Sequence, residues 1–374
     1  MVSLSRAPGR PTGRYTAIDL AIRSVALTTI ALSLWLIFRT VSTTPSVKQD
    51  AMRPRPGNVS LAAQRGGARI VTVPVKTAGG SSPIGPVGTL KLEPTTRLLI
   101  VAPHPDDEVI GAGGLIQRAV ALGLPVHVIF VTSGDGYPEA LRKDLHLSNP
   151  TGEAYVEMGE IRQREALRVL DGLGVSQDDV SFLGFPDGGL GGLWREYWSS
   201  DRPYRSPYTK QLHPPYADSV DPNVEYSGVD LVEVLERVLR SFSPTLIVIP
   251  HPNDVHPDHA AAGEFTIEAV DNLQEDGSLR RDVEVVTYLV HHGMWPDSNS
   301  GAAELKPPGP EWIPATDWLT FPLSDDERHG KEAALRGYES QMEVMEEFLM
   351  RFVRTNELFG ELRPAVQKQI AEVH

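Results

Sequence analysis

The sequence predicts an α/β fold in which a mostly parallel sheet is covered by helices on both faces. The first observation behind this prediction is that short apolar runs alternate with helical patterns from residue 96 onward. Strands that alternate with helices form right-handed βαβ units, whose crossover helices cover the sheet. The second observation is that polar motifs directly follow two of the apolar runs, at residues 98–102 and 246–249. Open α/β folds place their sites at this carboxyl edge of the sheet.

The individual elements follow from their apolar spacing. Continuous apolar runs such as LLIVA and VHVIFV are typical of strands buried on both faces, whereas apolar residues three and four positions apart are typical of helices. A helix at 159–173, for example, places Ile161, Ala166, Val169 and Leu170 on one side. In chain order we expect a strand at 98–102, a helix at 113–122, a strand at 126–131, a helix at 159–173 and a strand at 180–183. These are followed by a helix at 229–240, a strand at 246–249, a helix at 259–273 and a strand at 283–290.

The chain closes with a helical pattern at 325–352, predicted as one long helix or as a broken pair. Ser324 is a suitable N-cap, and acidic residues follow it in the first turn. The segment 194–222 is too long for an ordinary connection and is predicted to form a lid or rim loop near the site.

The N-terminal part of the chain is predicted to lie outside this fold. Residues 24–38 carry no charge, and together with residues 18–21 they approach the roughly 20 residues that span a bilayer. We interpret residues 1–39 as an uncleaved signal anchor, with a cleaved signal peptide as the alternative. Basic residues flank both sides, and their distribution leans toward an exported catalytic domain. Residues 40–95, rich in Pro, Ser, Thr and Gly, are predicted to be a linker, and residues 96–374 the catalytic domain.

Composition excludes several functional classes. The chain has 374 residues, a net charge of −14 and no cysteine. A nucleic-acid partner needs a basic face, which this charge argues against. Without cysteine, any metal must be held by histidine and carboxylate side chains. The glycine-rich run at 111–114 lacks the spacing of a phosphate-binding loop, so no nucleotide cofactor is expected; its glycines are expected to bring a helix close to the metal loop.

Two motifs carry the chemistry that the sequence predicts. His104 and Asp107 follow the strand at 98–102, and the segment HPDH, which ends in His259, follows the strand at 246–249. Together they offer two imidazoles and one carboxylate, which suit Zn²⁺, with Fe²⁺ or Mn²⁺ as alternatives. Three protein ligands leave a coordination position open for water, as catalytic sites require.

The remaining motif residues have roles in acid–base chemistry. Asp106 is positioned to act as general base, although it could instead cap the helix that begins near Gly111. His256 is predicted to stabilise an oxyanion or to protonate the leaving amine, and Asp258 to orient His256. Glu108 is predicted to be structural and to bond the turn.

With these motifs the chain resembles the PIG-L/LmbE-like family of zinc-dependent N-acetylglucosamine deacetylases. The family's first motif is present as PHPDDE at 103–108 and its second as HPDH at 256–259. Other similar positions are Arg162, Glu165, the run GFPDG at 184–188, and the late group Tyr338, Ser340 and Gln341. The resemblance covers residues 96–352.

The resemblance implies a Rossmann-like fold and hydrolysis of an acetamide on a glucosamine-containing conjugate. It implies the same metal ligands and the same base as the motifs do. It also implies that Arg162 and Asp187 contact sugar hydroxyls. The substrate is expected to be a glycolipid, an envelope glycan or a glycoside. The alternatives are an amide hydrolase with a substrate other than glucosamine, and an inactive sugar-binding homologue. The insertions 194–222 and 293–318 are expected to shape the cleft, and His251 and Asp254 to line it.

Overall fold

The computed structural model describes residues 88–144, 149–297, 303–309, 313 and 316–362. The predicted membrane segment, and most of the predicted linker, lie outside these residues. Among the helices of the described part, none has both the length and the apolar character that crossing a membrane requires.

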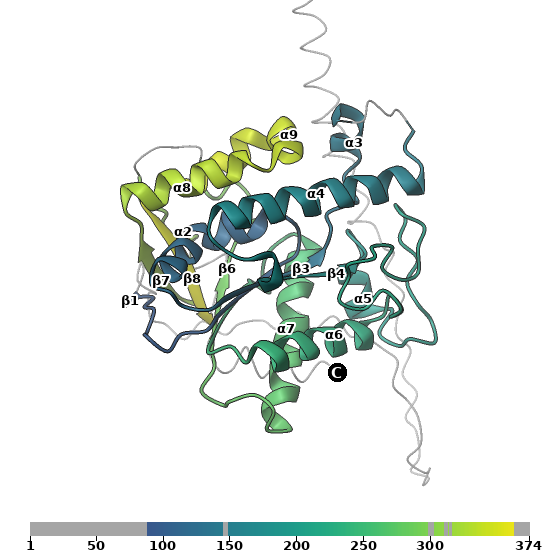
Figure 1. Ribbon diagram of the computed structural model, residues 1–374, viewed down its shortest axis with the longest axis horizontal. Coiled ribbons are helices and arrows are strands. Elements are labelled where there is room, and N and C mark those ends of the chain that lie inside the picture. Colours follow the sequence, from purple (N-terminus) through teal and green to yellow (C-terminus); the bar gives the residue numbers. More distant parts are fainter. Residues whose placement is uncertain (1–87, 145–148, 298–302, 310–312, 314–315, 363–374) are drawn as a thin grey trace, which may run out of the picture. The chain divides into compact units, whose positions relative to one another are not determined.

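The described residues build one sheet of eight strands, and its central strands are parallel (Figure 1). Strand β8 is antiparallel to both of its neighbours, β6 and β7. The order across the sheet is β1 (Gly88–Thr89), β7 (Thr316–Pro322), β8 (Asn356–Leu362), β6 (Glu284–Tyr288), β5 (Leu246–Pro250), β2 (Leu98–Ala102), β3 (Val126–Thr132) and β4 (Val180–Phe185).

Helices cover both faces of the sheet because two of its interior strands, β5 and β2, are apolar at every position. In β2, Leu98 and Ile100 belong to the core on one face, whereas Leu99 and Val101 belong to the core on the other. Side chains alternate along a strand, so a continuous apolar run needs a cover on both sides. Figure 1 shows the two layers: one contains α2 (Asp107–Ala121), α4 (Gly152–Gly172), α8 (Asp325–Arg336) and α9 (Glu339–Met350), and the other α5 (Leu190–Arg195), α6 (Gly228–Phe242) and α7 (Pro257–Glu275).

The structure confirms the mixed α/β architecture and resolves the C-terminal alternative. Residues 325–350 form a broken pair of helices, α8 and α9, and Ser324 caps α8 in a reciprocal box with Glu327. Strands β7 and β8 and the short helices α3 (Pro138–Asp144) and α5 were not predicted. Strand β1 pairs with β7, and Leu90 is 3% exposed, so the folded part of the chain includes residues that the sequence assigned to the linker.

The glycines of α2 serve helix packing, which corrects the expectation that they approach the metal loop. A Cβ atom at Gly111 would collide with the ring of Tyr288 on β6, and one at Gly114 with the side chain of Leu323. Because Gly111 and Gly114 have no Cβ atom, α2 can lie close to the sheet and to the segment that leads into α8. This packing fixes the helix whose first residue is Asp107.

Candidate metal centre

The predicted site residues meet at the carboxyl edge of the sheet. The loop after β2 supplies His104, Asp106 and Asp107, and the loop after β4 supplies Asp187. The segment after β5 supplies the HPDH motif, in which His256 is the N-cap of α7 and its ring nitrogen accepts a hydrogen bond from the backbone N–H of Asp258. The N-termini of α2 and α7 therefore both lie at the site, where their exposed N–H groups favour negative charge.

The three predicted metal ligands lie together. His104 Nδ1 is 3.0 Å and His259 Nε2 is 3.2 Å from the same carboxylate oxygen of Asp107, Oδ2. One ligand atom from each of the three residues lies within 4.8 Å of the others. Both ring nitrogens of His259 are buried without a well-formed hydrogen bond among the described residues. A buried imidazole nitrogen left unpaired beside a carboxylate fits a metal ligand, and this donor set suits Zn²⁺.

Charge interactions hold the triad in its ionised form. Burial disfavours a charged His104, yet the Asp187 carboxylate and the hydrogen bond with Asp107 raise its pKa well above the ordinary value. Burial likewise opposes charge on His259, whose pKa is raised to about 9 by Asp107 and Asp254. Burial would raise the pKa of Asp107, but His259 and His104 hold it well below its usual range. Without a metal these charges favour protonated imidazoles, and metal binding, which needs deprotonated ring nitrogens, would release protons.

Asp106 has the properties of a general base and does not cap a helix. Its side chain makes no capping hydrogen bond, and its φ of 124° is unusual for a residue other than glycine. Burial raises the pKa of Asp106 to about 7, although Arg162, 3.5 Å away, lowers it. A carboxyl group with a pKa near neutrality can both accept and return a proton.

Glu108 is structural, as predicted. Its carboxyl group accepts a hydrogen bond from the buried Tyr338 hydroxyl and a second, 3.1 Å long, from the backbone N–H of Asp106. Burial raises the pKa of Glu108 to about 8. Glu165 makes a parallel link, because it accepts bonds from the N–H and the hydroxyl of Ser340. The late Tyr-Glu-Ser-Gln group therefore attaches the junction of α8 and α9 to the site.

Arg162 and Asp187 both border the site and both have protein partners. The guanidinium of Arg162 donates to the carbonyl oxygens of Gly134 and Pro105. Asp187 accepts a 2.7 Å bond from the N–H of Gly136 and lies 3.2 Å from His104 Nε2. Burial opposes ionisation of Asp187, but His104 lowers its pKa far below the usual range. The predicted contacts of Arg162 and Asp187 with a sugar stay a prediction.

Asp258 does not orient His256 through its carboxylate, which corrects the prediction. Its oxygens accept bonds from the N–H groups of Gly188 and Leu190, at 2.6 and 3.0 Å, and one of them lies 3.4 Å from His104 Nε2. The reason is that Asp258 stands in the first turn of α7 with its side chain directed at the loop after β4. Burial and the nearby His104 lower the pKa of His256, which favours the neutral ring over an imidazolium.

Two residues contact His259 in ways that the sequence did not indicate: Asp254, which was expected only to line the cleft, and His291. The Asp254 carboxylate lies 3.5 Å from His259 Nδ1, the nitrogen opposite the triad, and accepts bonds from the N–H groups of Val290, His291 and His256. His291 follows β6, and its ring centroid is 4.6 Å from that of His259. The available signal was the pair His291–His292 directly after an apolar run. Burial, and then His259, lowers the pKa of His291 to about 3.

His251 lies away from the chemistry. It is fully buried, its Nε2 is 2.9 Å from the Thr316 hydroxyl, and its ring stacks on Trp318. The expectation that it lines the cleft is not met.

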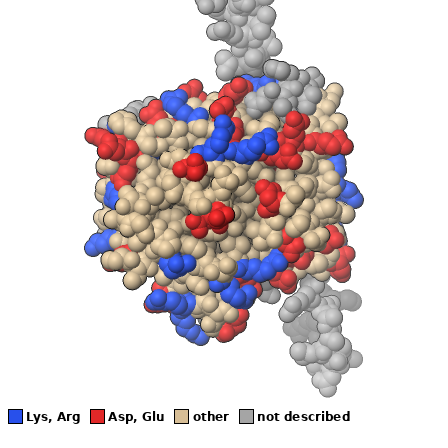
Figure 2. Space-filling model, viewed as in Figure 1, with Lys and Arg blue, Asp and Glu red and all other residues tan. Residues whose placement is uncertain are grey.

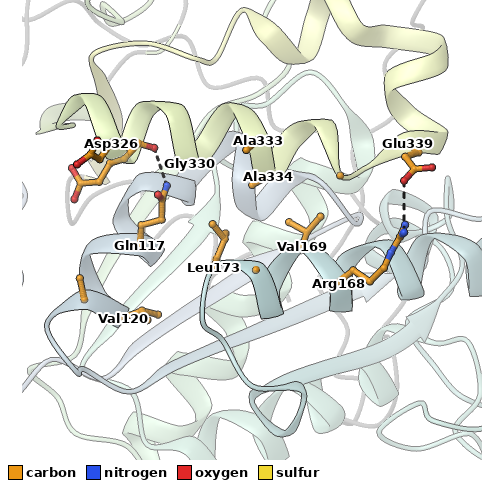
Figure 3. A pocket seen from close by; sticks show the side chains of 14 residues that line it. Gln117, Val120, Arg168, Val169, Leu173, Asp326, Gly330, Ala333, Ala334 and Glu339 are labelled. Atoms are coloured by element: carbon orange, nitrogen blue, oxygen red, sulfur yellow. Dashed lines mark hydrogen bonds and ion pairs between the residues drawn. The ribbon is translucent and has the colours of Figure 1, made fainter.

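The site opens into a cavity of about 210 Å³ that includes His104, Asp106, Asp107, Arg162, Asp187 and His256 in its lining. The 194–222 segment supplies none of its lining residues. The segment lies beside the site, where its Tyr208 ring is adjacent to Gly136, a lining residue, and to Gly188, and where the Tyr216 hydroxyl donates to the buried Asp135. A larger cavity, about 650 Å³, lies among α2, α4 and α8; Figure 3 shows its apolar floor at Val169 and Leu173 and the Arg168–Glu339 ion pair at its rim. It contains none of the predicted site residues.

The face of the molecule drawn in Figure 2 carries charges of both signs. Figure 2 shows acidic and basic side chains interspersed over the viewed face. The excess of acidic residues in the sequence is thus distributed among basic ones on this face.

Comparison with known proteins finds a matching family model, curated relatives and similar solved structures. Residues 99–270 match the family model described as "PIG-L: GlcNAc-PI de-N-acetylase". A 1D-myo-inositol 2-acetamido-2-deoxy-alpha-D-glucopyranoside deacetylase of Nocardia farcinica is 32% identical over 49% of this chain and 54% of its own length. The protein of the same description from Tsukamurella paurometabola is 28% identical over 67% of this chain and 84% of its own. The chain spans about half the length of the first curated relatives it matches. Among solved structures, the N,N'-diacetylchitobiose deacetylase of Pyrococcus horikoshii has 21% identity, a TM-score of 0.45, and coverage of 72% of this chain and 85% of its own.

Proposed function

Residues 99–270 are a domain of the PIG-L family, and from that premise we propose that the protein is a metal-dependent N-deacetylase. Its substrate is an N-acetylglucosamine-type conjugate, which is the substrate class that the names of its relatives describe. The observation that carries the proposal is the buried triad of His104, Asp107 and His259 with Asp106 beside it in one cavity. A triad that only stabilised the fold would not need a neighbouring carboxyl group with a pKa near 7.

His104, Asp107 and His259 would hold the metal, most suitably Zn²⁺. A bound divalent ion polarises the acyl carbonyl and lowers the pKa of a water molecule. Asp106 accepts the proton of the attacking water and returns it to the nitrogen of the leaving amine, which its pKa near 7 permits. The N–H of Asp258 donates to His256 Nδ1, so the neutral ring carries its proton on Nε2. The Nε2–H of His256 can donate to the oxygen of the tetrahedral intermediate.

The test is acetate release from N-acetylglucosamine conjugates by the metal-loaded, full-length protein. We expect Asp106→Asn to lower kcat by about 10² to 10⁴ while the protein keeps its metal, because it removes the proton acceptor but none of the ligands. We expect His259→Ala to lose both metal and activity. Asp282→Asn, an exposed carboxyl group paired with Arg280, is the matched control and should leave both unchanged.

Removal of metal with a chelator should abolish release, and added Zn²⁺ should restore it. Metal bound at one ion per chain with no release of acetate would favour the alternative of an amide substrate other than glucosamine. Activity that survives the chelator and both site variants would exclude the proposed mechanism. An inactive sugar-binding homologue would bind N-acetylglucosamine conjugates and release no acetate from any of them.

We also propose that residues 24–38 anchor the protein in a membrane and that the catalytic domain is exported. The uncharged apolar run supports the proposal. Anchoring would favour a glycolipid or envelope glycan as substrate. The test is the membrane fraction of the full chain beside that of a chain lacking residues 1–39, with protease accessibility of intact cells to establish the side. Equal recovery of both chains in the soluble fraction would refute the anchor.

A further inference from the structure

The cavity at the metal triad has a polar end and an apolar end. Its polar lining comes from the loops after β2, β3 and β4 and from α4, and includes Asp106, Arg162 and Asp187. Its apolar lining includes Ile110 on α2 and Met345 and Phe348 on α9. Gln341, also on α9, adds a polar side chain to the lining, and these residues of α9 lie beyond the stretch that matches the family model.

Four imidazoles establish that these ends lie on either side of the triad. Ring centroids are 5.2 Å apart for His104 and His256, 5.1 Å for His256 and His291, and 4.6 Å for His291 and His259. The ring of His259 closes the set at 5.3 Å from His104 and 5.1 Å from His256. The rings therefore form two triangles that share the His256–His259 edge, with His104 at one end and His291 at the other.

Each end of this set has its own neighbours. At the His104 end, Asp187 is in hydrogen-bonding distance. At the His291 end, the ring of Phe348 is stacked on the imidazole, with centroids 5.4 Å apart and an interplanar angle of 4°. Phe348 is also held edge-on by Phe352, at 5.5 Å, so its position is fixed before a ligand binds. Met345 stands at a kink in α9, where its backbone is not helical (φ −137°, ψ 28°), and lines the same cavity as Phe348.

We propose that the wall formed by Met345, Phe348 and His291 binds the acyl chain of the substrate, and that the enzyme accepts N-acyl chains longer than acetyl. This inference rests on the proposed deacetylase function. The amide group of an N-acyl sugar is planar and trans, so the sugar and the acyl chain extend in opposite directions from it. Sugar hydroxyls need donors and acceptors, which the Asp187 end supplies. With the amide at the triad and the sugar at that end, the acyl chain points at the apolar wall.

The experiment measures kcat/KM for N-acetyl-, N-propionyl- and N-butyrylglucosamine with the metal-loaded full chain, by release of free amine. Each methylene that is buried against the wall should raise kcat/KM by up to about fourfold, so butyryl should equal or exceed acetyl. A butyryl substrate that is cleaved less efficiently than the acetyl substrate would overturn the proposal. Failure to cleave the acetyl substrate would instead reject the deacetylase function itself.

Two variants on α9 give the specific test. Met345→Ala and Phe348→Ala should each lower the butyryl-to-acetyl ratio of kcat/KM by about threefold or more, because they remove apolar contacts that only the longer chain makes. Met350→Ala is the matched control: it is the same substitution on the same helix, at a half-buried residue that packs on the core and does not line the cavity. A ratio unchanged in both test variants, or changed equally in the control, would exclude the wall as the acyl site.

Discussion

At the scale of single residues, Asp254 shows how a carboxylate outside the triad can control a metal ligand. Its oxygen faces His259 Nδ1 at 3.5 Å, while Nε2 of the same ring faces Asp107. The charge of His259 lowers the pKa of Asp254 to about 2 although burial opposes this, so Asp254 is ionised at neutral pH. A carboxylate behind a ligating histidine fixes the ring and its tautomer and makes the other nitrogen a better ligand.

We therefore expect Asp254→Asn to weaken Zn²⁺ binding by about 10- to 100-fold without removing a ligand. Equilibrium competition with a chromophoric chelator measures the affinity. Asp258→Asn is a useful comparison, because that carboxylate contacts His104 and two backbone N–H groups but has no contact with His259 among the described residues. An Asp254→Asn protein with unchanged affinity and unchanged stability would show that His259 is held by its packing alone.

The residues of the triad could be predicted because each belongs to a short motif directly after a strand. The contacts of Asp254 and His291 with His259 could not, because they depend on how the loops after β5 and β6 fold against each other. The prediction that Asp258 orients His256 was wrong for a related reason. Its neighbour in sequence is His256, but the first turn of α7 directs its carboxylate at the loop after β4.

At the scale of elements, helix α2 is interrupted, and side chains from α8 and β8 form hydrogen bonds with its backbone near the break. The backbone at Ala112 is not helical, with φ −143° and ψ 18°. Glu357 on β8 accepts hydrogen bonds from the N–H groups of Gly114 and Leu115, and Lys331 on α8 donates to the carbonyl oxygen of Ile110. Lys331 and Glu357 are themselves paired at 2.7 Å, and each is 1% exposed. One buried ion pair thus satisfies the backbone groups that the break leaves free.

We expect Lys331→Met or Glu357→Gln alone to lower the free energy of unfolding by about 3–5 kcal/mol, since each leaves a buried group without its partner. Urea denaturation of the single and double variants measures the effect. The double variant should lose less than the sum of the singles, because the two charges are removed together. The exposed pair Arg336–Glu332 is the control, and its removal should leave stability essentially unchanged. Additive losses would indicate that the two residues act independently.

Helix α7 carries a partly buried acid that makes stability depend on pH. Burial raises the pKa of Glu264 from 4.5 to about 7, although Arg195 on α5 opposes the shift. The folded state therefore binds more protons than the unfolded state between about pH 4.5 and 7, and stability falls as pH rises through that range. We expect Glu264→Gln to raise the free energy of unfolding at pH 8 by about 1–3 kcal/mol and to have no such advantage below pH 4.5. Denaturation curves at both pH values decide this, and an equal effect at both would argue against titration as the cause.

Most elements of the sheet could be predicted, and those that could not have a physical reason for it. The strands from β2 to β6 are apolar runs buried on both faces, a pattern that sequence shows directly. Strand β8 contains Asn356, Glu357 and Glu361, and the structure accounts for two of these polar residues by the hydrogen bonds they make inside the fold. Strand β7 lies in a proline-rich stretch, and β1 has two residues. Their pairing is set by partners distant in the sequence rather than by local pattern.

At the scale of the whole molecule, the site is assembled from segments far apart in the chain. The family match at residues 99–270 contains the triad and the base. The later part of the chain supplies β6 to β8, α8 and α9, and with them the apolar end of the cavity. The triad and the base thus lie within the family match, whereas Met345 and Phe348 of the proposed acyl wall lie beyond it.

The N-terminal edge of the sheet also concerns the whole molecule, because it determines where the folded part begins. Strand β1 pairs in parallel with β7, the N–H of Leu90 donates to the carbonyl oxygen of Thr320 at 3.0 Å, and the Leu90 side chain is 3% exposed within the main core. A chain that begins at Thr96 loses these contacts and exposes the edge of β7. We expect it to unfold with a free energy about 2–4 kcal/mol lower than a chain that begins at residue 84.

Thermal and urea unfolding of the two chains measure this difference, and Leu90→Ala in the full-length protein should reproduce most of it, because deletion of a buried leucine side chain costs about 2–5 kcal/mol. Leu122→Ala is the control, since Leu122 is 59% exposed. The triad lies several strands away from β1 in the sheet, so the shorter chain should keep its metal affinity while it loses stability. Equal stability of the two chains would place the start of the folded domain after β1, because the contacts of Leu90 would then contribute nothing measurable to folding.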